Sequence, residues 1–409
     1  MALPVLPLDV VGVIIENLFK LDPSSVKTCS LVCRAFLPIC RRHIFETIAV
    51  KDDKGMRKLH RMLSSTPVIA SYIHKLDLPF ITKYKPDSVS KRLAEITGLR
   101  SLSIYNDSYG EEDEPAWNEY PLRRAILHFF CLPSFRVFTL VSVKDFFVAD
   151  LAPCSNLDYL DLRDLAFTSE SPPQIRFPPI KLVKLSVEGM DRSAIAHTWA
   201  AKCIDGEPFM DVSALTHLSM EVLSSSDAQA VQDLFLRCPK LLNMHFTAGN
   251  WNIGLISLGN ILNKSSALRT LMILDLFSIY DSRRGDDPLC GLVDEFERIS
   301  TENVIKHIKI ELSIFSGLDR TQHDKWSRLD KALTRPNRWP KLRQVSLRVK
   351  VAEEASKDAH KALEEDFPNF PHTQFQRLSA TSSLVFAFSV GLESDNWVDS
   401  DFGPESWEH

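Results

Sequence analysis

The sequence lacks the short motifs that hold a catalytic group in a fixed loop. Its 409 residues contain no G-x-S-x-G, G-x-G-x-x-G, G-x-x-x-x-G-K-[ST] or H-E-x-x-H pattern. Each of these patterns encodes a turn or a helix face that positions a nucleophile, a phosphate group or a metal ion. We therefore expect no catalytic residue, no cofactor and no enzyme activity.

Paired cysteines are also missing. The eight cysteines include no C-x-x-C pair, and they stand singly among apolar neighbours, as reduced core thiols do. Cys29, Cys33 and Cys40 lie close in sequence, but helix packing explains their spacing and a fourth ligand is missing. We expect no metal site and a reducing compartment, which is the cytosol or the nucleus.

Excess positive charge and long apolar runs are absent as well. The formal net charge is -5 and basic residues cluster only as doublets such as Arg41–Arg42, which argues against a nucleic-acid partner. No stretch reaches the roughly 18 apolar residues of a membrane span. The apolar run 10–15 follows no Lys or Arg, so it predicts a helix rather than a signal peptide, and we expect no membrane partner.

The first fifty residues, in contrast, are rich in apolar side chains at helical spacing. Val10, Ile14 and Leu18 form one stripe and Val11 and Ile15 a second. Three helices are expected at about 9–18, 24–33 and 35–43, followed by an extended segment at 44–48. A module this small buries a low fraction of its surface. The remaining apolar surface either binds a partner or caps the rest of the chain, and composition alone leaves both open.

The same residues carry a family resemblance. The run Leu6-Pro7-x-Asp9-Val10-Val11-x-x-Ile14-Ile15-x-x-Leu18, followed by Ser30-Leu31-Val32-Cys33-Arg34-Ala35-Phe36, resembles the F-box, and in particular the F-box-like proteins of mushroom-forming fungi. Phe36 stands where many members have Trp. The resemblance implies docking onto a Skp-type adaptor, and through it onto a cullin. The implied adaptor contacts are Leu6, Pro7, Val10, Ile14, Ile15, Leu18, Val32, Cys33 and Phe36.

Beyond residue 70 a second pattern, apolar-x-x-apolar-x-apolar, returns about every 30 residues. Its alternation has period two, which predicts a short strand in each copy. Amphipathic helices are expected between copies near Val231, Leu292 and Leu329. The ten copies lie at 73–78, 99–104, 135–140, 157–162, 182–187, 215–220, 241–246, 268–273, 305–310 and 342–347.

This body resembles the leucine-rich repeat family, without the asparagine ladder that typical repeats carry after the strand. The resemblance implies an α/β fold: a three-helix F-box followed by an irregular solenoid, with parallel strands on the concave side and helices on the convex side. An ordinary two-layer α/β domain is the alternative. The predicted domains are 1–50, 51–390 and an acidic flexible tail at 391–409.

If the solenoid forms, its partner-facing residues lie between the strand apolar positions. His217, His245 and His307 fall at such positions and are expected to share the concave face, as part of a binding surface rather than a metal site. The predicted zone for a target protein comprises Tyr159, Asp161, Arg163, His217, His245, Trp251, Lys309 and Arg348.

These expectations combine into one function. The chain is predicted to be the substrate-recognition subunit of a Skp-cullin-F-box ubiquitin ligase, whose repeats hold an unknown target protein. The alternative is a repeat scaffold with no ligase role, in which the first helices serve as a cap.

Overall fold

The computed structural model of this α/β protein describes residues 7–80, 87–106, 116–165, 174–175, 177–189, 202–222, 225–248, 258–280, 289, 291–314, 324–352 and 369–393. The chain divides into two compact units. Unit 1 comprises Met1–Leu182 and Gly189–Asp211, and unit 2 comprises Val183–Glu188 and Val212–His409.

Unit 1 begins with three helices, which we call the N-terminal helical module. They are α1 (Leu8–Leu21), α2 (Pro23–Cys29) and α3 (Phe36–Ile44). Helix α2 starts where Asp22 accepts a hydrogen bond from the N–H of Ser24 and Pro23 occupies the first turn. The module has its own small core of Val11, Ile15, Val26 and Cys40.

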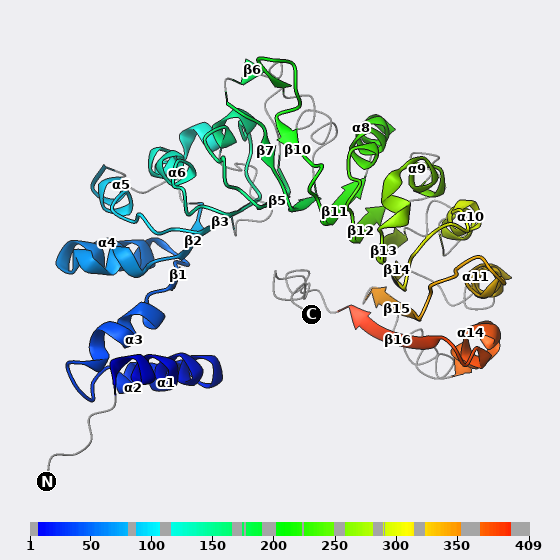
Figure 1. Ribbon diagram of the computed structural model, residues 1–409, viewed down its shortest axis with the longest axis horizontal. Coiled ribbons are helices and arrows are strands. Elements are labelled where there is room, and N and C mark those ends of the chain that lie inside the picture. The colour runs from blue at the N-terminus through cyan, green and yellow to red at the C-terminus, as the bar shows by residue number, and fades with distance from the viewer. Residues whose placement is uncertain are drawn as a thin grey trace, which may run out of the picture. The chain divides into compact units, whose positions relative to one another are not determined.

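The rest of unit 1 is a parallel sheet in the order β1-β2-β3-β4-β5. Helices α4, α5 and α6 lie on one face of these strands (Figure 1). Two small parallel pairs, β7 with β10 and β6 with β9, belong to the same unit. The bounds are β1 (Thr47–Ala49), α4 (Asp53–Ser65), η1 (Pro67–Tyr72), β2 (Lys75–Pro79), α5 (Asp87–Leu93), β3 (Ser101–Tyr105), η2 (Trp117–Glu119), α6 (Arg123–Phe130), β4 (Val137–Val141), η3 (Val148–Leu151), β5 (Tyr159–Arg163), β6 (Gln174–Ile175), β7 (Ile180–Lys181), β9 (Lys202–Cys203) and β10 (Met210–Asp211).

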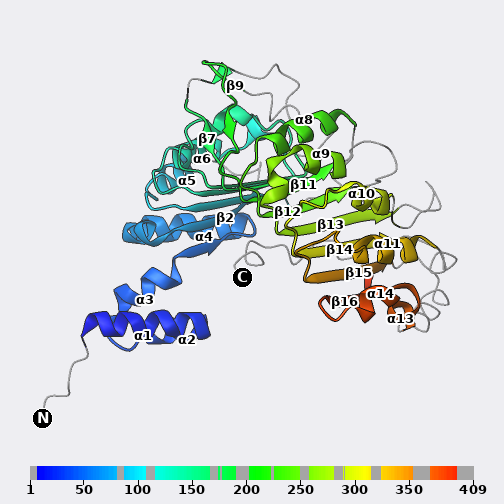
Figure 2. The same ribbon diagram turned by 45° about the vertical axis from the view of Figure 1, so that its right-hand side comes forward.

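Unit 2 is a second run of parallel strands, in the order β8-β11-β12-β13-β14-β15-β16. Helices α8 to α11 cover one face of these strands, as two views show (Figures 1 and 2). The bounds are β8 (Lys184–Glu188), β11 (His217–Val222), α8 (Ser225–Leu236), β12 (Asn243–Ala248), α9 (Leu258–Lys264), η5 (Ser266–Arg269), β13 (Ile273–Tyr280), α10 (Leu292–Arg298), β14 (His307–Ile314), α11 (Asp324–Thr334), β15 (Gln344–Ala352), α13 (Phe370–Gln374), α14 (Gln376–Ala380) and β16 (Val385–Glu393).

The repeated sequence pattern explains how each strand is packed. In β3, for example, Leu102 and Ile104 are fully buried, while the alternate residues Ser101, Ser103 and Tyr105 are half-buried. We call the side on which the helices pack the helix face and the opposite side the open face. Apolar residues thus alternate toward the helix face, and the residues between them form rows on the open face.

Backbone hydrogen bonds between repeats hold the strands in register. The carbonyl oxygen of His74 accepts the N–H groups of Arg100 and Ser101, at 2.8 and 3.0 Å, and the carbonyl of Arg100 accepts two N–H groups from the next repeat. The same paired contact recurs in unit 2 at the carbonyls of Thr216, Leu242, Met272 and Lys306. This carbonyl ladder explains how the strands stay aligned although the sequence lacks an asparagine ladder.

One predicted copy is displaced. Leu274, not Leu271, lies opposite Met244 in the sheet, so the eighth copy is Leu271–Leu276 rather than 268–273. Residues Ser266–Arg269 form the short helix η5 instead. The nine other copies each coincide with a strand, and β1 and β16 extend the series at its two ends. β16 runs three residues into the predicted tail at 391–409.

Candidate protein-interaction surfaces

The helical module carries a concentration of exposed apolar side chains. Of the thirteen large hydrophobic residues that are exposed in the described parts of the chain, seven lie between residues 8 and 32. We call these seven the N-terminal apolar surface. They are Leu8 at 61%, Val10 at 40%, Val13 at 58%, Ile14 at 50%, Leu21 at 86%, Leu31 at 84% and Val32 at 67% exposure.

The geometry of α1 explains this exposure. Successive residues in a helix are rotated by about 100°, so residues three and four apart share a face. Val11 and Ile15 face the core of the module and are 5% and 2% exposed. Val10, Ile14 and Leu21 lie on another face, which is exposed in the described part of the chain. An isolated soluble module gains nothing from that second apolar face, and patches of this kind are usual at binding sites.

The predicted adaptor contacts fall into two groups. Pro7, Val10, Ile14, Val32 and Cys33 are exposed on the module. Ile15 is buried in the module core, and Leu18 and Phe36 are half-buried against it, so these three support the surface from below rather than forming it. Leu6 lies outside the described residues. Leu31, which the sequence reasoning did not select, is among the most exposed of all.

A groove of about 780 Å³ runs along a third face of α1. Leu8, Gly12 and Val13 line one side of it, and Ile39 and Arg42 of α3 line another. A Cβ atom added at Gly12 would meet nothing within 4 Å. Glu16, also in the groove, has a lowered pKa because Lys20 donates a hydrogen bond to its carboxylate. The apolar surface of α1 therefore continues into a partly charged groove.

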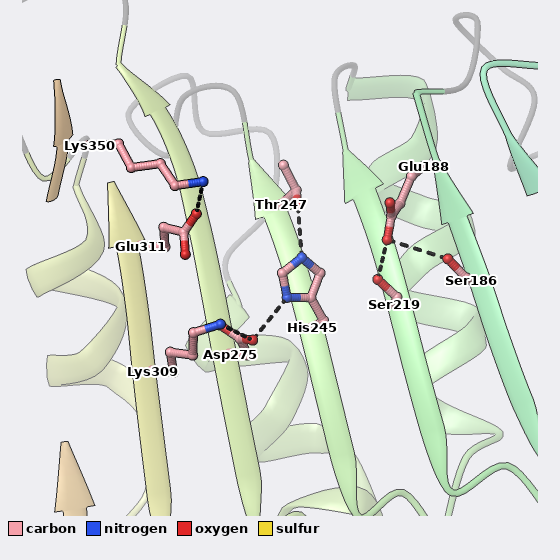
Figure 3. A network of polar contacts seen from close by, with 9 residues as sticks. All are labelled: Ser186, Glu188, Ser219, His245, Thr247, Asp275, Lys309, Glu311 and Lys350. Carbon is pink, nitrogen blue, oxygen red and sulfur yellow. Dashed lines mark hydrogen bonds and ion pairs between the residues drawn. The ribbon is translucent and has the colours of Figure 1, made fainter. Parts of the chain in front are cut away.

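The open face of unit 2 carries a network of polar side chains (Figure 3). The register places Ser219, His245, Asp275 and Lys309 side by side on four successive strands. Nδ1 of His245 lies 3.3 Å from Oδ2 of Asp275, and Nζ of Lys309 lies 3.4 Å from the same oxygen. Polar contacts thus cross from β12 to β14.

Three further polar contacts lie on either side of this group. Oε1 of Glu188 accepts hydrogen bonds from Ser219 at 2.5 Å and from Ser186 at 3.3 Å. Nζ of Lys350 lies 2.6 Å from Oε1 of Glu311, whose side chain is 4% exposed. Buried polar groups of this kind fix the local geometry because each requires its partners in place. The face is therefore a polar surface with charges of both signs.

The predicted target zone is only partly exposed. Asp161 and His245 are 2% and 6% exposed and serve the sheet itself, Asp161 by pairing with Arg163 at 2.9 Å. Tyr159, Arg163, His217 and Lys309 are half-buried, Arg348 is exposed, and Trp251 lies outside the described residues.

The three histidines do not form one column. His217 lies opposite Asn243 and His307 opposite Ile273 in one row, whereas His245 lies in the next row, opposite Ser219. Burial, and then the charge of Lys184, lowers the pKa of His217. The sequence reasoning also missed Asp275, Glu311 and Lys350, which occupy the same kind of position between strand apolar residues.

The described residues lack two features. They contain no group of three or more His, Cys, Asp or Glu side chains placed to hold a metal ion. In the same residues, no helix has both the length and the apolar character needed to cross a membrane.

No protein-family model matches the chain, and no curated protein matches it significantly.

Proposed function

We propose that this chain is the substrate-recognition subunit of a Skp-cullin-F-box ubiquitin ligase. The helical module docks onto a Skp-type adaptor, and the adaptor joins the chain to a cullin. The strand repeats hold a target protein. The observation that carries the proposal is the N-terminal apolar surface, which gathers seven of the thirteen large exposed hydrophobic residues of the described chain.

The module is well suited to such docking. Its core of four buried residues folds the three helices without using Val10, Ile14 or Val32. These side chains are held on helices or beside them, so few degrees of freedom are lost when a partner covers them. Lys27 and Arg34 are exposed on either side of Leu31 and Val32. A partner with an apolar patch and acidic residues at its rim fits this surface.

The role of the repeats is recognition without bond-making. In this mechanism the chain raises the effective concentration of target lysines near a ubiquitin carrier that other subunits hold. The open face of unit 2, with Arg348 exposed beside the ordered Glu311 and Lys350, is the surface assigned to the target. The seven cysteines that the structure describes are all free thiols. Free thiols are consistent with a protein that functions in the reducing environment of the cytosol or the nucleus.

Co-purification with a Skp-type adaptor tests the proposal. The full chain and a Val10→Asp/Ile14→Asp/Val32→Asp variant are each co-expressed with the adaptor and purified. We expect a one-to-one complex with the unmodified chain and at least about a hundredfold weaker binding for the variant, because three charges enter an apolar interface.

A matched control separates docking from general surface effects. Val68 is 50% exposed, like Ile14, but lies in η1. Val68→Asp is expected to bind the adaptor as the unmodified chain does, and circular dichroism should show all three proteins folded. If the unmodified chain never retains the adaptor, the ligase role fails and the repeat-scaffold alternative takes its place.

A further inference from the structure

The charged side chains on the open face of β13, β14 and β15 are arranged with the cations more exposed than the anions. Asp275 pairs with Lys309 on the next strand, and Glu311 pairs with Lys350 (Figure 3). The two carboxylate side chains are 12% and 4% exposed, whereas the two lysine side chains are 40% and 23% exposed. A partner that approaches this part of the open face therefore meets positive charge first.

Arg348 adds a positive charge to the same surface. It lies opposite Glu311 on β14 and Ser389 on β16, and its side chain is exposed. Glu311 already pairs with Lys350 at 2.6 Å, and Arg348 forms no ion pair with another described side chain. A guanidinium presents its N–H donors as a flat fork that fits both oxygens of a carboxylate. Arg348 is therefore suited to a carboxylate that a partner supplies.

Phe277 provides an aromatic contact in the same row of residues. The register runs from Phe277 on β13 through Glu311 to Arg348 on β15. Phe277 is half-buried, and Nζ of Lys350 lies 6.0 Å from the centre of its ring. Neighbouring strands are about 4.8 Å apart, so the backbones at Phe277 and Arg348 are separated by roughly 9.6 Å. The row thus combines an aromatic ring and a cation at a defined spacing.

We propose that this row binds an extended acidic segment of the target protein. An Asp or Glu carboxylate of the segment meets Arg348, and an aromatic side chain three residues away packs on Phe277. A polyproline II segment repeats every three residues with a rise of about 3.1 Å, so side chains three apart share one side at about 9.3 Å. This distance matches the spacing of the two residues. The inference rests on the proposed function, which assigns the open face of unit 2 to the target.

Charge complementarity selects the acidic occupant. Asp275 and Glu311 are each balanced by a lysine, so the charge of Arg348 is left uncompensated among these side chains. A basic segment would bring a like charge to Arg348, and a neutral segment would cover the guanidinium without supplying an anion. An acidic segment avoids both penalties.

Peptide binding to the full chain, without any adaptor, tests the inference. The probe is the peptide Gly-Ser-Phe-Pro-Pro-Glu-Ser-Gly, blocked at both ends and labelled with an uncharged fluorophore. Its matched partner has Gln in place of Glu, and the prolines favour the polyproline II form of both. Fluorescence anisotropy at about 20 mM salt should show the Glu probe binding about five- to tenfold more tightly, because the Gln probe lacks the charge-assisted contact. The difference should shrink as salt is added.

Substitutions at Arg348 test whether this residue recognises the carboxylate. Arg348→Gln should bind the two probes equally, and Arg348→Glu should prefer a third probe with Lys in place of Glu. Arg343→Gln is the matched control, because Arg343 is also exposed and lies five residues earlier, on the other side of the extended chain. This variant should keep the preference of the unmodified chain. Phe277→Leu should weaken both probes by a similar factor, about two- to fivefold, because the aromatic contact is lost.

Four results would overturn the inference. The unmodified chain binds neither probe at about 1 mM, or it binds both equally, or Arg348→Gln keeps the preference for Glu. The fourth is that the Glu probe binds only after residues 394–409 are removed, because the acidic tail, which contains Phe402-Gly-Pro-Glu405, would then be the occupant.

Adaptor binding distinguishes this inference from the proposed function. Arg348→Gln should co-purify with the Skp-type adaptor as the unmodified chain does, because Arg348 belongs to unit 2 and the helical module to unit 1. Failure of the unmodified chain to retain the adaptor rejects the ligase role. Failure of the probes with adaptor binding intact rejects only the acidic class of target.

Discussion

The helical module and the strand repeats use apolar side chains in opposite ways. Four apolar residues are buried in the module core, whereas seven large ones are exposed on its surface. In the rest of the described chain only six large hydrophobic residues are exposed. Strands β2 to β5, β8 and β11 to β15 each contribute fully or nearly fully buried residues. The difference shows that exposed large apolar residues are concentrated at the helical module and are not a general feature of the described chain.

Geometry accounts for the contrast. In a strand, residues alternate between two faces, so an apolar-x-apolar pattern sends all its apolar side chains to one side. Helix α1 has apolar residues around more than one face, and α2 and α3 cover only the face of Val11 and Ile15. A small helical module cannot bury the rest. The same kind of apolar residue that builds a core in the repeats therefore stays exposed in the module.

The largest expected effect comes from a cavity in the repeats. Phe138 is fully buried, and its ring centre lies 4.9 Å from that of Phe130. Phe138→Ala should lower the free energy of unfolding by about 3–5 kcal/mol, because both burial and packing are lost. Ile14→Ala on the module surface should change it by less than about 0.5 kcal/mol. Urea unfolding followed by tryptophan fluorescence measures both, and equal effects would contradict the contrast.

A second substitution separates the two faces of α1. Ile15 is 2% exposed and Ile14 is 50% exposed, although they are adjacent. Ile15→Ala should cost about 2–4 kcal/mol, enough to open a module with so small a core. Hydrogen exchange should then show lost protection in α1 to α3 and unchanged protection in β12 to β15. Protection that survives in the module would mean that other contacts hold it.

Most of the strand repeats were predictable from the sequence. Burial on one side of each strand requires apolar residues at a regular spacing, and that spacing can be recognised in the sequence. Nine of ten predicted copies coincide with strands, since each copy needs two apolar residues toward the helices. The copy at 268–273 was displaced because Leu268, Leu271 and Leu274 offer two overlapping matches to one pattern. Only the pairing of Leu274 with Met244 distinguishes them. β1 was expected only as an extended segment, because the residues around Ile48 do not have the full apolar-x-x-apolar-x-apolar pattern.

The candidate surfaces were less predictable. Helical spacing indicated excess apolar surface but could not say that Ile15 faces inward and Leu31 outward, because that depends on where α2 and α3 pack. On the open face, the sequence indicates which residues point away from the helices, but not which side chains they contact. Asp161 and His245 occupy outward positions and are nevertheless buried by neighbouring side chains, a result that only the pairing of strands reveals.

Replacing a glycine by alanine should change the free energy of unfolding in opposite directions in the strand repeats and in the helical module. Gly189 follows β8 with a φ of +59°, and an added Cβ would lie 1.9 Å from Oδ1 of Asp164. Gly189→Ala should cost about 1–3 kcal/mol, from backbone strain and the displaced carboxylate. Gly12 lies inside α1 with open space around it, so Gly12→Ala should add about 0.5–1 kcal/mol of stability. Thermal unfolding measures both, and a destabilised Gly12→Ala would show that α1 is packed more tightly.

The smallest expected effect is a pH dependence confined to the repeats. Burial and the charge of Lys184 hold the pKa of His217 below its ordinary value of 6.5. The unfolded chain then binds more protons than the folded one as pH falls through 6.5 toward the lowered pKa, so stability must fall in that window. The effect is small because His217 is only half-buried. His217→Gln, which removes the proton-binding group, should flatten the change in urea midpoint between pH 7.5 and 5, whereas Ile14→Ala should leave it unchanged. An identical pH profile for His217→Gln and the unmodified chain would contradict the prediction.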